Sequence, residues 1–570
     1  MTLKTLKALA VVTAGIVVSM PAPGPAMANS ISGAYLAARH ASHFSDYEKA
    51  AEYYTLALAR EPGNPQLLED AISAFVGLGD LVRAVPIARK MEADGLQSQT
   101  ANMVLIADLA EKGDFAAILK QLDQRHSVGG LVDGLVRAWA LLGEAQTKQA
   151  MQAFDKVSQG KGTGSFGLYH KALALASIGD FEAADQILSG AAAGPVRATR
   201  HGIIAHAQVL SQLGRDKDAL QLLDATLGTG PDPRLAGMRR KLEAGKTLSF
   251  TVVSTADQGI AEVFYTVAGA LNSEADDNYT LIFSRVSESV NPKHTDALLL
   301  TADLFDRLKR YDLAIDTYKR IGRDDPAYYV AELGRADALG KEGKTGASIE
   351  VLEQLSKTYP DLAVVQVTLG DSLRRTEDFK GAATAYSRAL DLYGAPKSTQ
   401  WFVYYTRGIA YERLNQWENS EADLREALKL RPNQPNVLNY LGYSLVEKGI
   451  KLDEALKLIQ QAVAAKPDDG YITDSLGWVL YQLGRYDEAV KYMERATEQM
   501  PTDATINDHL GDVYWAVGRH REARVQWRRA LSFDPGEADA TRIRRKLQLG
   551  LDAVLKAEGA APVAVSANGG

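Results

Sequence analysis

The chain has 570 residues, of which 46% are hydrophobic and 24% are charged, and its formal net charge is -7. This apolar fraction can bury a large core, so a chain that is disordered throughout is excluded. The negative balance provides no general attraction to nucleic acid, because phosphate binding needs a concentrated positive surface. The absence of cysteine excludes disulfides, thiolate metal sites, iron–sulfur clusters, a cysteine nucleophile and an acylated lipoprotein anchor.

The N-terminus has the pattern of a secretory signal peptide. Lys4 and Lys7 precede an apolar run of 13 residues (8–20), and Ala26 and Ala28 form an A-x-A cleavage pattern. A helix of that run would be about 20 Å long, which is shorter than the roughly 30 Å hydrocarbon core of a bilayer. We therefore predict a cleaved signal peptide over residues 1–28 and a periplasmic protein, the alternative being that the segment is retained as an anchor.

A repeat of about 34 residues dominates the second half of the chain. Its first small residue recurs 34, 35 and 34 positions apart, and two further small positions and a closing proline keep step with it. These positions are Gly408, Gly442, Gly477 and Gly511; Ser420, Ala455, Ala489 and Ala523; Ala427, Ala462, Ala496 and Ala530; and Pro432, Pro467, Pro501 and Pro535. Each unit contains two patterns of helical period separated by a turn, and its proline cannot continue the second helix. Because one hairpin cannot bury its apolar faces alone, we expect neighbouring units to stack.

This spacing closely resembles the tetratricopeptide repeat. The same register continues upstream through Ala302, Ala336 and Gly370, and more weakly through segments such as 46–62 and 179–188. We count about six units before residue 259 and about eight after it. The resemblance implies an all-α fold, a right-handed superhelical solenoid of about 14 helix–turn–helix repeats in two arrays.

Breaks in the repeat predict the domain boundaries. The segment 247–258 is rich in β-branched residues and lacks a helical stripe, so we expect an extended crossover, a linker or a hinge. It separates a degenerate N-terminal array (29–246) from a C-terminal array (259–535). Residues 536–557 have the amphipathic pattern of a capping helix, which the open end of a solenoid needs, and residues 558–570 are expected to be a disordered tail.

No motif in the sequence supports catalysis, a cofactor or a metal site. A string at 338–345 fits the loosest Walker A pattern and one at 162–167 fits G-x-G-x-x-G, but both fall between repeat helices with no strand before them. The close pairs of histidines, such as His201 and His206, lack the H-E-x-x-H arrangement of a zinc site. We therefore expect a protein that is not an enzyme, with no cofactor and no metal, in which these residues occupy turns or the surface.

In the resembled family the first helix of each repeat lines a concave groove, at the second, fifth, ninth and twelfth positions of the repeat. Carried over to this sequence, these positions hold Phe402, Tyr405, Ile409, Asn439, Tyr443, Asp474, Trp478, Tyr481, Asp508, Asp512 and Trp515. Aromatic faces and an Asn amide suit the binding of a peptide; the alternative is that some of these side chains fill gaps between repeats. Family members that clamp a peptide carboxylate use Lys and Arg here, so this acidic aromatic groove suits a neutral or basic segment instead.

The repeats over 441–515 are similar to those of large tetratricopeptide proteins of the Gram-negative envelope, such as the outer-membrane adaptor of a carboxy-terminal processing protease. The resemblance implies a non-catalytic scaffold or adaptor that binds proteins or peptide segments and recruits a protease or a cell-wall hydrolase. The alternative is an assembly factor for surface polysaccharide, pili or outer-membrane proteins. An enzyme would need a separate catalytic domain, for which the repeats leave no room. We expect no nucleic-acid partner and no small-molecule substrate.

Basic residues gather near the C-terminus. They are Arg519, Arg521, Arg524, Arg528, Arg529, Arg542, Arg544, Arg545 and Lys546. We expect them to face outward, either as a solvated surface or as a site of peripheral contact with anionic lipid, to which each basic residue contributes about 1 kcal/mol.

Overall fold

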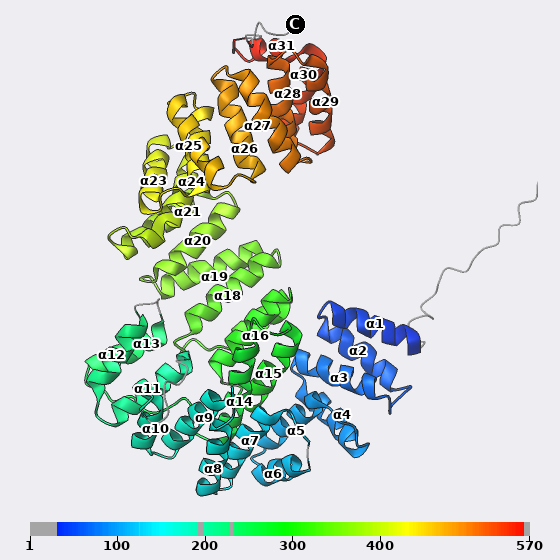
Figure 1. Cartoon of the computed structure of the whole chain (residues 1–570), viewed down its shortest axis with the longest axis vertical. Helices are drawn as coiled ribbons and strands as arrows, with labels where there is room; N and C mark the ends of the chain where they lie inside the picture. The colour runs from blue at the N-terminus through cyan, green and yellow to red at the C-terminus, as the bar shows by residue number, and fades with distance from the viewer. Residues whose placement is uncertain (1–30, 125, 192–198, 228–231, 562, 564–570) are drawn as a thin grey trace, which may run out of the picture. The chain divides into compact units, whose positions relative to one another are not determined.

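The computed structural model describes residues 31–124, 126–191, 199–227, 232–561 and 563. Within these residues the protein is helical, with 31 α-helices, one 3-10 helix (η2, Ser398–Gln400) and no strand (Figure 1). This confirms the predicted all-α fold. No helix in this part of the chain is both long enough and apolar enough to cross a bilayer. The predicted signal peptide lies outside the described residues.

The structure divides into two compact units, residues 1–348 (unit 1) and residues 349–570 (unit 2). In unit 1 most helices form successive hairpins, in which α1 pairs with α2, α3 with α4 and α7 with α8. The helices are α1 (Ile31–His43), α2 (Tyr47–Leu58), α3 (Pro65–Leu78), α4 (Leu81–Ala93), α5 (Gln99–Glu111), α6 (Phe115–Asp123), α7 (Gly130–Gly143), α8 (Thr147–Ser158), α9 (Gly164–Ser177), α10 (Phe181–Leu188), α11 (Arg200–Gln212), α12 (Asp216–Leu227), α13 (Pro233–Glu243), α14 (Ala256–Leu271), α15 (Asp277–Val290), α16 (Thr295–Arg307), α17 (Tyr311–Lys319) and α18 (Tyr328–Lys341). Helix α19 (Thr345–Thr358) contains the boundary between the units.

Unit 2 continues the hairpins, with α20 paired to α21, α22 to α23 and so on to α28 and α29. The helices are α20 (Ala363–Arg375), α21 (Phe379–Tyr393), α22 (Trp401–Arg413), α23 (Trp417–Leu430), α24 (Pro435–Glu447), α25 (Leu452–Ala465), α26 (Gly470–Gln482), α27 (Tyr486–Gln499), α28 (Ala504–Ala516), α29 (His520–Ser532), α30 (Glu537–Leu549) and α31 (Leu551–Ala557).

Turn residues explain where the second helix of several hairpins begins. Asp46, Asp80, Asp114 and Asp180 precede α2, α4, α6 and α10, and each side chain accepts a backbone N–H from the first turn of its helix. These N–H groups have no partner within the helix, and such a cap contributes about 1 kcal/mol. Gly113 lies just before Asp114 with a φ of 70°, so the sequence Gly-Asp ends one helix and starts the next.

The repeated small residues allow the two helices of a hairpin to approach closely. A Cβ atom on Gly477 would lie 2.8 Å from the side chain of Met493, and one on Gly511 would lie 2.4 Å from the ring of Trp527. In both hairpins the large side chain belongs to the second helix and is buried. The spacing of the repeat therefore reports a packing requirement, as the sequence predicted.

The hairpin of α14 and α15 lies inside unit 1, against the first helices of earlier hairpins. Helix α14 packs on α7 and α9, and α15 packs on α3 and α5 (Figure 1). Trp139 of α7 is fully buried against Gly259 of α14, where a Cβ atom would come 2.2 Å from the indole ring. Leu135 and Phe264 belong to the same buried hydrophobic cluster. The face that these first helices would offer to a partner is therefore filled by the chain itself.

The segment that leads into α14 is fastened to α11. The side-chain amide of Gln208 forms two hydrogen bonds of 2.9 Å with Thr251, one to its hydroxyl and one from its backbone N–H. The backbone of Leu248 is bonded to two further side chains of α11. This non-helical segment is thus an extended crossover that packs on unit 1. The predicted division into two arrays at 247–258 stays a prediction; the boundary between the two compact units of the structure falls after residue 348.

Two helices, α30 and α31, stand where one capping helix was predicted over 536–557. They are separated by Gly550, whose φ is 84°. A Cβ atom at this position would lie 2.7 Å from the ring of Trp515, so the break requires glycine for its backbone conformation and for its close contact. In the predicted tail, the described residue Val563 donates its N–H to Asp552 of α31.

Candidate functional site

The eleven predicted groove residues lie on four first helices of unit 2. They are Phe402, Tyr405 and Ile409 on α22; Asn439 and Tyr443 on α24; Asp474, Trp478 and Tyr481 on α26; and Asp508, Asp512 and Trp515 on α28. Phe402 is 40% exposed, whereas Asp474, Asp512 and Trp515 are buried and the other seven are half-buried. The predicted set therefore has two parts. The exposed and half-buried members on α22, α24 and α26 form the accessible part, and Asp474 and the three members on α28 form the other part.

The accessible part begins with aromatic rings on α22 and α24. The ring of Tyr405 stacks on Trp401 with centroids 6.3 Å apart, and it lies 6.4 Å from Phe402. On its other side it meets the edge of Tyr440 at 5.9 Å. These rings form a contact series across two repeats, and large rigid rings provide contact area at a low cost in conformational entropy.

A second group of stacked rings lies on α26 and α28. Trp478 is sandwiched between Tyr481, at 4.9 Å, and His509, at 4.1 Å, with nearly parallel planes. The Nδ1 atom of His509 lies 3.1 Å from both carboxylate oxygens of Asp474. Burial alone would lower the pKa of His509, but Asp474 outweighs it and raises this pKa. Asp474 was predicted to line the groove; its buried carboxylate holds the stack in place instead.

Asp508 and Asp512 were predicted to make the groove acidic, and this is corrected by Lys546 of α30. The ammonium group of Lys546 is 0% exposed and lies 2.8 Å from Asp508 and 2.7 Å from Asp512. Asp512 also accepts the indole N–H of Trp527 at 2.9 Å. Lys546 of the capping helix therefore offsets one of the two negative charges, and Arg542 of the same helix lies 3.8 Å from Asp512. A signal was present in the sequence, because Lys546 follows the buried Ile543 by three residues and so shares its helical face.

Trp515 also faces the cap rather than a groove. Its indole N–H donates to Asp552 of α31 at 2.9 Å, and its ring stacks on His520 with centroids 4.1 Å apart. The alternative stated for the predicted set, that some members fill gaps in the solenoid, applies to this tryptophan. Its role is to hold the C-terminal cap on α28.

Two side chains of the accessible part have an unsatisfied polar atom. Among the described residues, neither Oδ1 of Asn439 nor Nε1 of Trp478 has a hydrogen-bond partner. Both atoms are shielded from solvent, and an unpaired buried polar atom costs about 1–3 kcal/mol. A ligand that reaches them after a small side-chain rotation would recover part of this free energy.

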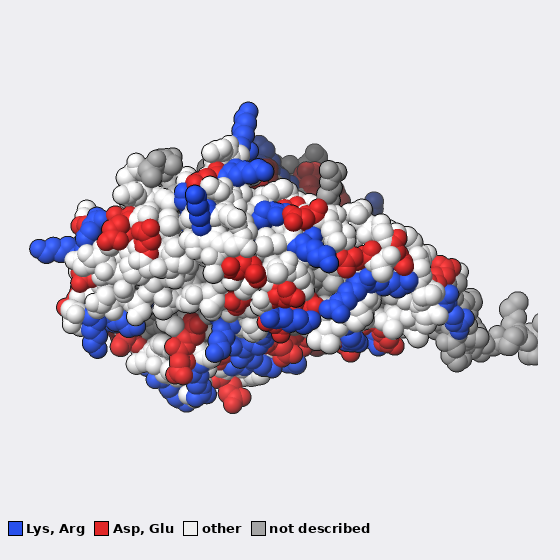
Figure 2. Space-filling model, turned by 90° about the horizontal axis from the view of Figure 1, so that it is seen from below, with Lys and Arg blue, Asp and Glu red and all other residues white. Residues whose placement is uncertain are grey.

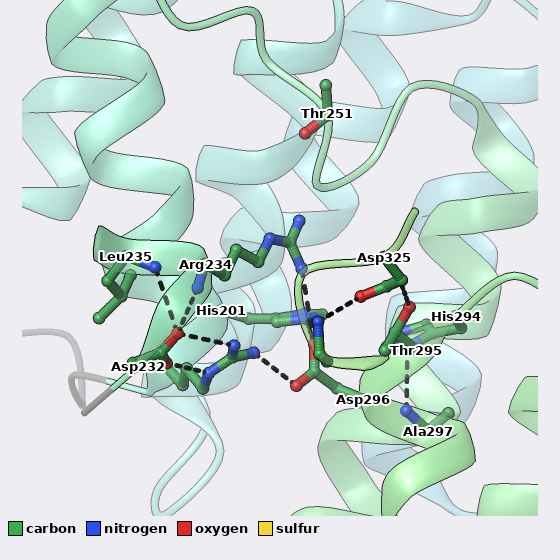
Figure 3. Close-up of polar contacts among 12 residues, drawn as sticks. His201, Asp232, Arg234, Leu235, Thr251, His294, Thr295, Asp296, Ala297 and Asp325 are labelled. Carbon is green, nitrogen blue, oxygen red and sulfur yellow. Dashed lines mark hydrogen bonds and ion pairs between the residues drawn. The ribbon is translucent and has the colours of Figure 1, made fainter. Parts of the chain in front are cut away.

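Unit 1 contains a separate network of charged side chains contributed by α11, α14, α16 and the start of α13. Figure 3 shows its part around His201, Asp232 and Asp296. Arg200 bridges two carboxylates, at 2.6 Å from Asp232 and 2.6 Å from Asp296. His201 lies between Asp296, which is 2.5 Å from Nε2, and Glu262, which is 3.2 Å from Nδ1. Sequence reasoning considered His201 only with His206, because its true partners are 61 and 95 positions away and no local pattern announces them.

His201, Glu262 and His294 place three ligand atoms within 4.8 Å of one another, a set that could hold a metal ion. The hydrogen bonds of His294 favour a different explanation. Its Nδ1 accepts the N–H of Ala297 at 3.1 Å, which assigns the proton to Nε2, and Nε2 donates to Glu262 at 2.9 Å. A metal-binding histidine needs a lone pair on the ligating nitrogen and donates its other N–H. These residues therefore fit a hydrogen-bonded network of histidines and a carboxylate better than a metal site.

Charge explains the protonation of His201. Burial would lower the pKa of His201, but the carboxylates of Glu262 and Asp296 outweigh burial and raise it to about 9. Burial alone would raise the pKa of Glu262 and of Asp296. The charge and hydrogen bonds of His201 outweigh burial and hold both pKa values well below the usual range. Near neutral pH the network thus contains an imidazolium between two carboxylates.

The two strings that resemble phosphate loops lie at helix ends. The string 338–345 starts in α18, turns at Gly343 and ends at the start of α19. In the string 162–167, a turn leads into α9 at Gly164. The described residues contain no strand, so neither string has the strand–loop–helix context of a nucleotide-binding loop.

Several of the basic residues near the C-terminus have acidic partners. Arg519 pairs with Glu494 and Glu522, and Lys546, which was predicted to face outward, is buried. Arg521 and Arg528 are exposed. Figure 2 shows that basic and acidic side chains are likewise interspersed on the face of the protein that it draws. Peripheral contact with a membrane stays a prediction.

A model of the family described as tetratricopeptide repeat matches residues 282–328, 333–396, 405–470 and 451–504. The TPR repeat-containing protein PA4667 of Pseudomonas aeruginosa is 30% identical over 173 residues, which are 30% of this chain and 28% of that protein. The aspartyl/asparaginyl beta-hydroxylase of Mus musculus is 26% identical over 157 residues, 26% of this chain and 21% of the enzyme. The chain thus spans less than a third of the length of these curated relatives.

Solved structures of repeat proteins also match this chain. The crystal structure of the APC/C hetero-tetramer Cut9–Hcn1 matches 92% of this chain and 97% of its own, with 15% identity and a TM-score of 0.39. YrrB, described as a TPR protein with an unusual peptide-binding site, matches 35% of this chain and 99% of its own, with 21% identity and a TM-score of 0.28.

Proposed function

Tetratricopeptide repeats occur within residues 282–504 of this chain, and from this premise we propose that the protein is a non-catalytic adaptor whose unit 2 binds a segment of a partner protein. Repeats of this kind generally mediate protein–protein interactions. The surface proposed for binding, called the aromatic groove below, consists of Phe402, Tyr405, Asn439, Tyr443, Trp478 and Tyr481.

The observation that carries this proposal is the occurrence of exposed or half-buried rings and of unsatisfied polar atoms on the successive first helices α22, α24 and α26. Phe402 is 40% exposed, and the polar atoms without partners belong to Asn439 and Trp478. Rings anchor apolar side chains of a bound segment, and an Asn amide can bond its backbone. Unit 1 offers no equivalent surface on α3, α5, α7 and α9, because α14 and α15 cover these helices.

The chemistry of the aromatic groove favours a segment with apolar side chains and little net charge. The acidic groups that the sequence placed there are paired, Asp474 with His509 and Asp512 with Lys546. None of the six groove residues is Lys or Arg. They therefore include no basic side chain that could clamp the C-terminal carboxylate of a peptide. We propose an internal, largely apolar segment of the partner as the bound element.

We further propose that the protein acts in a bacterial envelope, where it recruits a protease or a cell-wall hydrolase. The support for this compartment is the sequence pattern of residues 1–28. The second candidate is an assembly factor for surface polysaccharide, pili or outer-membrane proteins, which would use the same groove for a different partner.

A photo-reactive amino acid placed at single positions of the full chain, in its own cells, tests the proposal. Phe402 is the exposed member of the aromatic groove, and Tyr471 is exposed on α26, the helix of Trp478 and Tyr481. Val525, which is 50% exposed on the second helix α29, provides a matched control. We expect a defined crosslinked protein from positions 402 and 471 and none from 525, with loss of the product when Asn439 is replaced by alanine. Equal crosslinking from all three positions would contradict a role for the groove.

Mass spectrometry of the crosslinked protein then separates the two envelope roles. A protease or hydrolase supports recruitment, and a component of an export or assembly system supports the second candidate. A soluble protein of the cytoplasm would contradict both.

A further inference from the structure

A cavity of about 460 Å³ opens in unit 1 between the start of α9 and the end of α14. Tyr169 and Tyr265 line it and also contact the charged network. The hydroxyl of Tyr169 donates to Glu262 at 2.7 Å, and the ring of Tyr265 lies 4.6 Å from that of His294. The charged network therefore holds two of the lining side chains in place. The cavity belongs to unit 1, whereas the aromatic groove belongs to unit 2.

The lining of this cavity is aromatic and carries a negative charge. Three aromatic residues line it, Phe166, Tyr169 and Tyr265, together with the exposed residue Glu274. No Lys, Arg or His occurs among the described lining residues. Glu274 forms none of the ion pairs found in the described part of the chain, so its charge is available to a ligand.

Helix ends at the cavity oppose each other. Gly269, Ala270 and Asn272 lie at the C-terminal end of α14, where the helix dipole is negative, and Ser165 lies in the first turn of α9, where it is positive. Each helix end is equivalent to about half an elementary charge, so the two ends roughly cancel. The full charge of Glu274 then decides the sign.

The ion-paired part of the charged network next to the cavity has no net charge. It contains three carboxylates, Asp232, Glu262 and Asp296, and three positive groups, Arg200, Arg234 and the protonated His201. A phosphate is therefore disfavoured at the Gly-rich start of α9, because Glu274 would repel it and no basic side chain lines the cavity to offset this repulsion.

We propose that this cavity binds an organic cation, either the ammonium or methylated ammonium group of a small molecule or the side chain of a lysine from a partner. The rings attract the cation through their quadrupoles, and Glu274 supplies the opposite charge. This proposal goes beyond the adaptor role, because it assigns a ligand to unit 1.

Titration calorimetry on the full chain at low ionic strength tests the proposal with matched probes. Choline represents a free methylated cation, N-acetyl-lysine methylamide represents a lysine side chain, and 3,3-dimethylbutan-1-ol is a neutral molecule with the shape of choline. Glu274→Gln removes the charge without changing the size of the side chain. Glu182→Gln, at an exposed position of α10 outside the cavity, is the matched control.

We expect saturable binding of at least one cation, about tenfold weaker binding of the neutral alcohol, and a similar loss in Glu274→Gln but not in Glu182→Gln. Binding of choline alone would assign a small-molecule ligand, and binding of the lysine probe would assign a partner side chain. The proposal is overturned if neither cation binds, if the alcohol binds as tightly as choline, or if Glu274→Gln has no effect. Melting curves of both variants establish that they are folded, and crosslinking at position 402 reports the adaptor role separately.

Discussion

The ammonium nitrogen of Lys546 lies 2.7 Å from a carboxylate oxygen of Asp512, and these side chains are 0% and 2% exposed. The cap of the solenoid is thus joined to its last repeat by a buried ion pair. Replacing Lys546 by methionine removes the nearest positive charge from Asp508 and Asp512, and the guanidinium of Arg542, 3.8 Å from Asp512, does not replace its contacts. Removal of one partner of a buried pair costs about 3–5 kcal/mol, so we expect Lys546→Met to lower the stability of unit 2 by that amount in urea denaturation.

The control for this prediction is Arg545→Met, on the neighbouring half-buried side chain, for which we expect a change below about 0.5 kcal/mol. The triple variant Lys546→Met, Asp508→Asn, Asp512→Asn should regain part of the loss, because it removes the uncompensated charges. Equal stability of Lys546→Met and the parent chain would mean that water reaches the two carboxylates in solution.

Closure of unit 1 depends on a glycine in α14. A Cβ atom on Gly259 would lie 2.2 Å from the fully buried ring of Trp139, whereas one on Gly269 of the same helix would meet nothing within 4 Å. Overpacking of a filled core costs about 1–3 kcal/mol, and Gly→Ala at an open helical position gains about 0.5–1 kcal/mol. We therefore expect Gly259→Ala to destabilise unit 1 and Gly269→Ala to stabilise it. Amide hydrogen exchange should show faster exchange of α14 and α15 in the first variant alone; unchanged exchange there would argue against their packing on α7.

His201 makes the stability of unit 1 sensitive to alkaline pH. Its pKa is raised from 6.5 to about 9 in the folded chain. Because the folded state holds this proton more tightly, the resulting stability is fully present below pH 6.5 and is lost as the pH rises to about 9. The shift corresponds to a loss on the order of 3 kcal/mol. We expect urea denaturation to show this fall over pH 6.5–9, and His201→Gln, which cannot titrate, to be less stable at pH 6.5 and flat across the same window.

An NMR titration of the His201 ring measures the same quantity directly and does not depend on a variant that folds. A midpoint near 6.5 would contradict the prediction, because it would mean that Glu262 and Asp296 do not hold the imidazolium.

His170 has the opposite effect, on the acid side. It accepts the indole N–H of Trp139 at 3.1 Å through Nδ1, and burial lowers its pKa to about 4. Because the unfolded state binds this proton more tightly, stability is fully present above pH 6.5 and is lost as the pH falls to about 4, by an amount on the order of 3 kcal/mol. We expect thermal melts to shift downward over this window in the parent chain and in the exposed-site control His43→Gln, but less in His170→Gln. A parent chain whose melting temperature is constant between pH 6.5 and 4 would contradict the assignment.

The parts of the fold that follow from local pattern were predictable. Gly477 and Met493 occupy fixed positions of a repeat, and their contact lies within one hairpin, so spacing alone indicates it. The contact of Trp139 with Gly259 joins residues 120 positions apart in different repeats, and no periodicity connects them. For this reason the sequence assigned the helices after residue 259 to a separate C-terminal array, and did not indicate that α14 and α15 pack against first helices of the N-terminal one.

The groove was only partly predictable for a related reason. Family positions locate residues on the first helices, but they do not report what covers them. Asp512 and Trp515 occupy groove positions, yet Lys546 and Asp552 of the two capping helices bond to them. The position of a cap is decided by tertiary packing, so the accessible residues among the eleven could be identified only from the structure.

Asn439 separates binding from stability within the aromatic groove. Its Oδ1 has no hydrogen-bond partner among the described residues, so replacing Asn439 by alanine removes an unsatisfied atom as well as some packing. Because these two effects oppose each other, the free energy of unfolding should not fall by more than about 0.5 kcal/mol. If the amide bonds the backbone of a bound segment, the same substitution removes about 1–1.5 kcal/mol of binding free energy, roughly a tenfold loss of affinity. The measurement is the affinity for the protein crosslinked at position 402, beside urea denaturation of the same variant. Asn507→Ala on α28 is the contrast, because Asn507 is 0% exposed and its amide N–H donates to the backbone of Asp503 at 2.7 Å, whereas its Oδ1, like that of Asn439, has no partner among the described residues. We expect this substitution to lower the free energy of unfolding. An Asn439→Ala protein that is destabilised yet binds normally would assign Asn439 to packing between repeats.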